Sequence, residues 1–154
     1  MNSVQLTADL VESFAGTFIS PRYDNRAPTP VLHREAWALY TSPHPQVMCI
    51  APREHAKSTA LTTVYILAEV LFRSSDYVIL VGSTEEFAAE QLGNISDELR
   101  SNEDLIQEFG IKGFEVDSRT DIIVVMRDGH KFRILCRGSE QRIRGRLWKG
   151  KRPN

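Results

Sequence analysis

The stretch Cys49-Ile50-Ala51-Pro52-Arg53-Glu54-His55-Ala56-Lys57-Ser58-Thr59 has the layout of a phosphate-binding loop. The apolar residues at 47–50 predict a buried strand, and the long apolar run after Lys57 predicts a deeply packed helix. In such a loop, backbone N–H groups and the N-terminus of the helix face a polyphosphate. We therefore expect Lys57 to reach the β- and γ-phosphates and the hydroxyl of Ser58 to hold Mg²⁺.

The loop departs from the pattern G-x-x-x-x-G-K-[ST], because Ala51 and Ala56 replace both glycines. The alternative is an ordinary turn between a strand and a helix that happens to contain Lys and Ser. Three features favour phosphate binding: the length of the loop, the position of Lys57 at the start of the helix, and the apolar character of that helix. Alanine also leaves the backbone N–H donors accessible.

Besides Lys57, two side chains of the loop can carry positive charge. Arg53 and His55 are either a solvated rim or groups that neutralise the γ-phosphate. The second role suits Arg53 better, because a planar guanidinium matches the geometry of phosphate oxygens.

The composition indicates one soluble globular domain. The chain has 154 residues and a formal net charge of −1, so its overall charge implies no particular partner. The charge is unevenly distributed, however. Acidic residues gather in the middle: Glu85, Glu86, Glu90, Asp97, Glu98, Glu103, Asp104 and Glu108. Basic residues gather near the end, opposed only by Glu140: Arg137, Arg142, Arg144, Arg146, Lys149, Lys151 and Arg152. Such an asymmetry can mark an end that faces a polyanion.

The cysteines and the N-terminal residues indicate a cytoplasmic protein. Cys49 and Cys136 lie in separate apolar runs, which predicts free thiols in a reducing compartment rather than a disulfide framework. The four histidines show no spacing typical of metal ligands. We see neither a signal-peptide pattern nor an apolar run long enough for a bilayer, so no membrane partner is expected.

The pattern of apolar residues and turn residues predicts an α/β fold. Helices are expected at 7–18, 57–72 and 103–109. Another should begin at Pro30, with Thr29 as its N-cap, and end before Pro43. A further helix should follow Ser83, which forms a capping box with Glu86. Strands are expected at 47–50, 77–81, 122–126 and 131–135. The first two strands and helix 57–72 should form a right-handed βαβ unit with parallel strands. Asp128-Gly129 predicts a hairpin between the last two.

Several segments of the chain resemble those of a known family. Its loop is similar to the deviant Walker A loop of tailed-phage terminase large subunits, the ATPases that pump DNA into procapsids. Many of these read Ala-Pro-Arg-Gly-x-Gly/Ala-Lys-Ser-Thr, so Ala56 fits the pattern and Glu54 stands where glycine is usual. Residues 81–88 resemble the segment after the family's second strand. Residues 144–153 resemble its Arg-Gly…Gly-x-Arg-Pro segment, which leads into the Walker B strand. The stretch with His33, Arg34, Glu35 and Trp37 resembles the one that lies near the adenine in these enzymes.

The resemblance spans about residues 30–153 and implies a P-loop NTPase fold of the ASCE type. This fold would be an incomplete three-layer sandwich with a hairpin near its C-terminus, comprising an N-terminal helix and loop at 1–29 and a partial ATPase domain at 30–154. The implied cofactors are ATP and Mg²⁺. The implied nucleotide-binding residues are Ala51, Pro52, Arg53, Glu54, His55, Ala56, Lys57, Ser58 and Thr59, with Ser58 on the metal. Arg53 would stabilise the transition state in cis. Arg144 would reach the ATP of a neighbouring subunit, although a solvated or DNA-facing role for Arg144 stays open.

The resemblance also implies binding partners and an incomplete ATPase domain. The partners would be double-stranded DNA, the portal, the small terminase subunit and further copies in a ring, in the bacterial host cytoplasm. The sequence ends where the Walker B strand should begin, so we expect the N-terminal part of such an enzyme, inactive by itself. Strand 122–126 with Asp128 is a weak alternative for Walker B, because a hairpin is favoured there. Two other functions remain: a helicase-like P-loop ATPase fragment, and a non-enzymatic nucleotide- or DNA-binding module that acts through its basic end.

Overall fold

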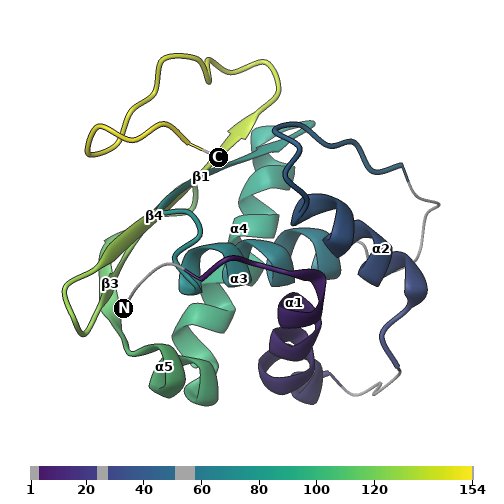
Figure 1. Cartoon of the computed structure of the whole chain (residues 1–154). Coiled ribbons are helices and arrows are strands. Elements are labelled where there is room, and N and C mark those ends of the chain that lie inside the picture. Colours follow the sequence, from purple (N-terminus) through teal and green to yellow (C-terminus); the bar gives the residue numbers. More distant parts are fainter. Residues whose placement is uncertain (1–3, 24–27, 51–57, 154) are drawn as a thin grey trace. The chain divides into compact units, whose positions relative to one another are not determined.

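The computed structural model describes residues 4–23, 28–50 and 58–153 (Figure 1). By its internal contacts the chain divides into two compact units, Met1–Ser74 and Ser75–Asn154. The structure is mixed α/β, which confirms the class expected from the sequence.

The regular structure of the first unit is helical in its described residues. Its elements are α1 (Ala8–Phe14), the π-helical η1 (Ala15–Ile19), the 3₁₀ turn η2 (Ser20–Arg22), α2 (Val31–Tyr40), the π-helical η3 (Ser58–Val64) and α3 (Tyr65–Leu71). Thr7 caps α1, since its hydroxyl accepts a hydrogen bond from the backbone N–H of Leu10 at 3.2 Å. The helix expected at 7–18 is thus confirmed. α2 ends before Pro43 as expected, but it starts one residue late, because Pro30 has an extended backbone and takes the N-cap position predicted for Thr29.

The strand predicted at 47–50 is absent from the structure. Residues 46–50 have no regular secondary structure, and the side chains of Met48 and Ile50 are 80% and 88% exposed. A strand needs a neighbouring backbone to bond its N–H and C=O groups, and no described segment supplies one here. The predicted βαβ unit is therefore wrong. Among the described residues, the parallel partner of strand 77–82 is the strand at 131–138.

The second unit is a four-stranded sheet with two helices. Its elements are β1 (Tyr77–Gly82), α4 (Glu85–Ser101), α5 (Glu103–Phe109), β2 (Ile111–Asp117), β3 (Asp121–Met126) and β4 (Lys131–Gly138). The strand order is β1-β4-β3-β2, with β1 parallel to β4 and the other pairs antiparallel. α4 packs against β1 and β4 (Figure 1). The face of α4 that packs against the sheet is apolar and buried: Ala88, Leu92, Ile95 and Leu99.

Two details of this unit differ from the prediction. α4 is capped by Thr84 and not by Ser83, because the helix begins at Glu85. Thr84 has an extended backbone and its hydroxyl accepts a hydrogen bond from the N–H of Phe87. β2 was not predicted at all. Its register against β3 shifts twice, and these irregularities break the alternation that would have marked it as a strand.

The hairpin is confirmed. The N–H of Met126 donates to the carbonyl of His130 at 2.8 Å, and Gly129 has φ of +87°, which glycine adopts without strain. β3 is antiparallel to both its neighbours and Asp128 lies in the turn. A Walker B carboxylate ends a central parallel strand, so strand 122–126 with Asp128 does not fit that role.

Gly138 lies where β4 meets the start of α4, and we expect its replacement by alanine to destabilise the second unit. An added Cβ would lie 2.9 Å from the backbone N of Glu85, which cannot move without shifting α4. The expected loss in the free energy of unfolding is about 1–3 kcal/mol. Gly93→Ala is the matched control, because nothing lies within 4 Å of the added atom and alanine favours the helix by about 0.5–1 kcal/mol. Urea denaturation measures both, and equal midpoints for the two variants would contradict this packing.

Candidate functional site

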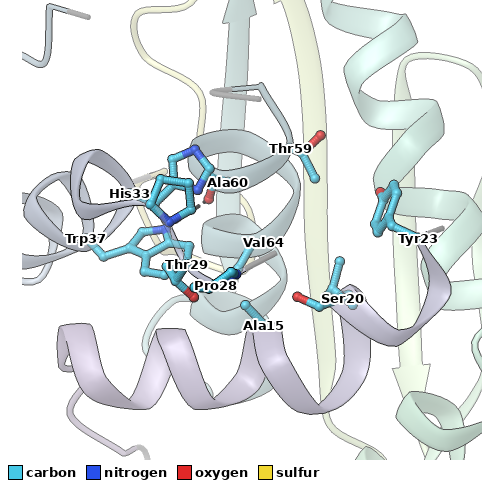
Figure 2. Close-up of a pocket in the computed structure, with 12 residues that line it drawn as sticks. Ala15, Ser20, Tyr23, Pro28, Thr29, His33, Trp37, Thr59, Ala60 and Val64 are labelled. Atoms are coloured by element: carbon cyan, nitrogen blue, oxygen red, sulfur yellow. Dashed lines mark hydrogen bonds between the residues drawn. The ribbon is translucent and has the colours of Figure 1, made fainter. Parts of the chain in front are cut away.

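The first unit contains a concave pocket of about 320 Å³ (Figure 2). It is lined by residues from η1, η2, α2 and η3, by the residue after η2 and by the residues just before α2: Ala15, Ile19, Ser20, Tyr23, Pro28, Thr29, Pro30, His33, Trp37, Thr59, Ala60 and Val64. Most of these side chains are apolar, and three carry aromatic rings. The pocket is therefore shaped for a ligand with a flat, largely apolar part.

Trp37 forms one wall of the pocket and fixes it to η3. The indole Nε1–H donates to the carbonyl of Ala60 at 3.0 Å, and the Trp37 side chain is 2% exposed (Figure 2). His33 lies one turn earlier on the same face of α2, with its ring centroid 6.0 Å from that of Trp37. α2 thus presents two neighbouring rings to the pocket while its hydrogen bond holds the first turn of η3.

Two segments of π-helix meet at this pocket. η1 contributes Ala15 and Ile19, and η3 contributes Thr59, Ala60 and Val64. π-Helical turns are rare and occur frequently at functional sites. Because two such segments line the same pocket, it is a candidate site.

The surrounding contacts hold α2 against its neighbours. Arg34 Nε donates to Glu12 Oε2 at 2.7 Å, and this pairing raises the pKa of Arg34. The hydroxyl of Tyr65 donates to the carbonyl of Tyr40 at 3.2 Å, and burial raises the pKa of Tyr65 so that it stays a neutral donor. α2 is therefore tied to α1 at its start and to α3 at its end, which keeps the aromatic wall in place.

The chemistry of the lining suits an uncharged aromatic ring. A volume of about 320 Å³ lies at the small end of the range of about 300–1,000 Å³ for ligand pockets. Among the described residues, the lining includes no carboxylate, lysine or arginine. Hydroxyls of Ser20, Thr29 and Thr59 supply polar groups that can orient a heterocycle by hydrogen bonds.

The predicted phosphate-binding residues are described only in part. Ala51, Pro52, Arg53, Glu54, His55, Ala56 and Lys57 lie outside the described residues. Ser58 is exposed at the first residue of η3, and Thr59 is half-buried and lines the pocket. Arg144 is exposed in the second unit, beside other basic residues.

The sequence indicated only part of the pocket. The resemblance pointed to the helix with His33 and Trp37, and both line it. Ile19 and Tyr23 were not identified, because they stand in or near a segment that reads as a loop. The one signal for Tyr23 was an aromatic residue within an otherwise Pro-, Asn- and Arg-rich stretch.

Comparison with models of known protein families, with curated proteins and with solved structures found no match. In the part of the chain that the structure describes, no group of three or more His, Cys, Asp or Glu side chains is placed to hold a metal ion. None of the described helices is long and apolar enough to span a membrane.

Proposed function

We propose that the first unit binds Mg·ATP, with the base in the aromatic pocket and the phosphates at residues 51–59. We further propose that the chain is the nucleotide-binding part of a P-loop ATPase that drives DNA packaging, as the resemblance to terminase large subunits implies. The observation that carries the proposal is the position of the pocket, which extends to Thr59 at the end of the candidate phosphate-binding loop.

Chain geometry links the two halves of this site. Thr59 lines the pocket, and Lys57 is two residues away, so their Cα atoms are at most about 7.6 Å apart. A ligand with a ring in the pocket would therefore have its remaining part close to Lys57 and Ser58. A nucleotide has this layout, with a flat base at one end and anionic oxygens at the other.

The described residues also fit a magnesium ion that arrives with the nucleotide. Ser58 is exposed at the start of η3, so its hydroxyl oxygen is accessible. Mg²⁺ keeps several waters and takes few protein ligands beside the phosphates, so in this proposal the Ser58 hydroxyl supplies one ligand and the phosphates supply others. In the proposal Arg53 neutralises phosphate charge in cis and Arg144 acts on the nucleotide of a neighbouring copy.

Filling the pocket tests whether it holds the base. Ser20 is exposed and lines the pocket, so Ser20→Phe should place a ring in the cavity without disturbing the core. We expect this variant to weaken Mg·ATP binding about 10–100-fold, because the base loses its contacts. Binding can be followed through the fluorescence of Trp37 in a Trp148→Phe background.

The matched control for this experiment is Ser13→Phe. Ser13 is an exposed serine of α1 that does not line the pocket, so this variant should bind as the parent does. Equal affinities for both variants and the parent would show that the nucleotide base lies elsewhere.

A further inference from the structure

The second unit contains a small polar cleft between α4 and the turn that joins β2 to β3. Its volume is about 230 Å³. One side is formed by residues of α4 and the other by the end of β2 and the turn after it: Ala89, Gly93, Ser96 and Arg100, and Asp117, Ser118 and Arg119. The α4 residues are four, three and four positions apart, so they lie on one face of the helix.

Small residues form the helix side of the cleft. Ala89 and Ser96 are each 4% exposed, so the floor that they form lies below the outer surface of the helix. Between them, an added Cβ at Gly93 would meet no atom within 4 Å. The cleft therefore has open space at the middle of this helix face.

The hydroxyl of Ser96 is the polar group on this floor. Ser96 is buried, yet its hydroxyl has no hydrogen-bond partner among the described residues. Burying a hydroxyl without a hydrogen bond costs free energy. A ligand that fills the cleft and hydrogen-bonds to Ser96 would remove this cost.

The opposite side of the cleft carries positive charge. Arg100 forms an ion pair with Asp117, and its guanidinium lies 4.8 Å from the centroid of the Phe114 ring, so its orientation is fixed. This pair offsets the charge of Asp117, which is the only carboxylate of the described lining. Arg119 is exposed, and no ion pair joins it to a carboxylate in the described part of the chain. The guanidinium of Arg119 is therefore available to an anion.

We propose that this cleft binds a small phosphate monoester. A phosphate group has three strong acceptor oxygens, which donors on both sides of the cleft can reach together. Arg119 supplies a guanidinium fork, Ser96 supplies a hydroxyl, and Arg100 keeps N–H donors that Asp117 does not use. Among the described residues the lining has no aromatic ring, so the cleft offers no stacking surface for a nucleobase. The rest of the ligand is accordingly small and polar.

This inference concerns the second unit and does not depend on nucleotide binding by the first. Two-dimensional amide NMR of the full chain tests it, during titration with glycerol 3-phosphate at constant ionic strength. We expect saturable shifts in the signals of Gly93, Ser96 and Arg119. Shifts at Ser58 and Thr59 would report phosphate binding by the first unit, so the two sites are read separately. A parallel titration with N-acetyl-phosphoserine amide distinguishes a phosphorylated side chain from a small-molecule ester as the better ligand.

Filling the cleft should prevent binding. Gly93→Leu places a side chain in the open space, and we expect it to lower the affinity at least 10-fold. Asn94→Leu is the matched control, because Asn94 is the next residue of α4, is exposed and does not line the cleft. This control should bind as the parent does.

Removing the charge should weaken binding as well. We expect Arg119→Gln to lower the affinity about 10-fold or more, whereas Lys112→Gln, at an exposed position of β2 outside the cleft, should keep it. The proposal is overturned if the cleft signals do not saturate, if Gly93→Leu binds as tightly as Asn94→Leu, or if sodium acetate binds as tightly as either monoester. Thermal unfolding verifies that all four variants are folded.

Discussion

Replacing Trp37 with alanine is expected to lower the free energy of unfolding by about 3–5 kcal/mol, the usual cost of removing a large buried ring. Trp37 is 2% exposed, and its indole N–H is bonded to the carbonyl of Ala60. The variant loses packing between α2 and η3 and the hydrogen bond to that carbonyl. Chemical denaturation followed by circular dichroism measures the loss.

Two controls separate the components of this effect. Trp37→Phe keeps an aromatic ring and loses the hydrogen bond, so its expected cost is about 1 kcal/mol plus a small packing loss. Trp148→Ala removes the other tryptophan, which is only half-buried, and should cost clearly less than Trp37→Ala. If Trp37→Ala were no more destabilising than Trp148→Ala, Trp37 would not anchor the pocket wall.

Replacing Lys57 with alanine is expected to weaken Mg·ATP binding about 10–100-fold, because a hydrogen-bonded charge contributes about 1.5–3 kcal/mol. Lys57 precedes Ser58, the first residue of η3, where a lysine side chain can reach the phosphates of a nucleotide whose base lies beside Thr59. The loss should be large for ATP and small for adenosine, which has no phosphates. Equilibrium dialysis with both ligands makes this comparison.

The control for the lysine is Lys112→Ala, which removes an equal charge from an exposed position of β2. It should leave the affinity for Mg·ATP unchanged. If both lysine variants bound Mg·ATP as tightly as the parent, Lys57 would have no role at the phosphates. An equal loss of ATP and adenosine in Lys57→Ala would instead indicate damage to the pocket.

The sequence predicted those elements whose signal is local. A helix was predicted at 103–109, and the structure places α5 at Glu103–Phe109. Asn102 caps it by accepting from the N–H of Leu105, and Gly110, with φ of +69°, ends it. The hairpin at Asp128-Gly129 was equally clear. Caps, glycine turns and helical periodicity are written in neighbouring residues, so one sequence is sufficient to see them.

Pairing between distant segments could not be predicted in this way. The run 47–50 is as apolar as β1. Of these two segments, only β1 has a partner strand among the described residues, and that partner is β4. An apolar run shows that a segment can form a strand but not which neighbour bonds its backbone. β2 was missed for a related reason, because two shifts in its register hide the alternation of its side chains.

The candidate site was predicted unevenly for the same reasons. His33 and Trp37 stand one helical turn apart and were identified through a resemblance, and the structure places both in the pocket. Ile19 and Tyr23 come from a segment without periodicity, and only the folded chain brings them to Thr59. The π-helical turns that shape the walls have no recognisable sequence pattern.

Calorimetric titration of the unmodified chain with Mg·ATP tests directly whether the first unit binds a nucleotide. We expect saturable binding of one nucleotide per chain, with competition by adenosine and weaker binding when Lys57 is alanine. A flat titration up to millimolar Mg·ATP, with the chain shown to be folded, would contradict it.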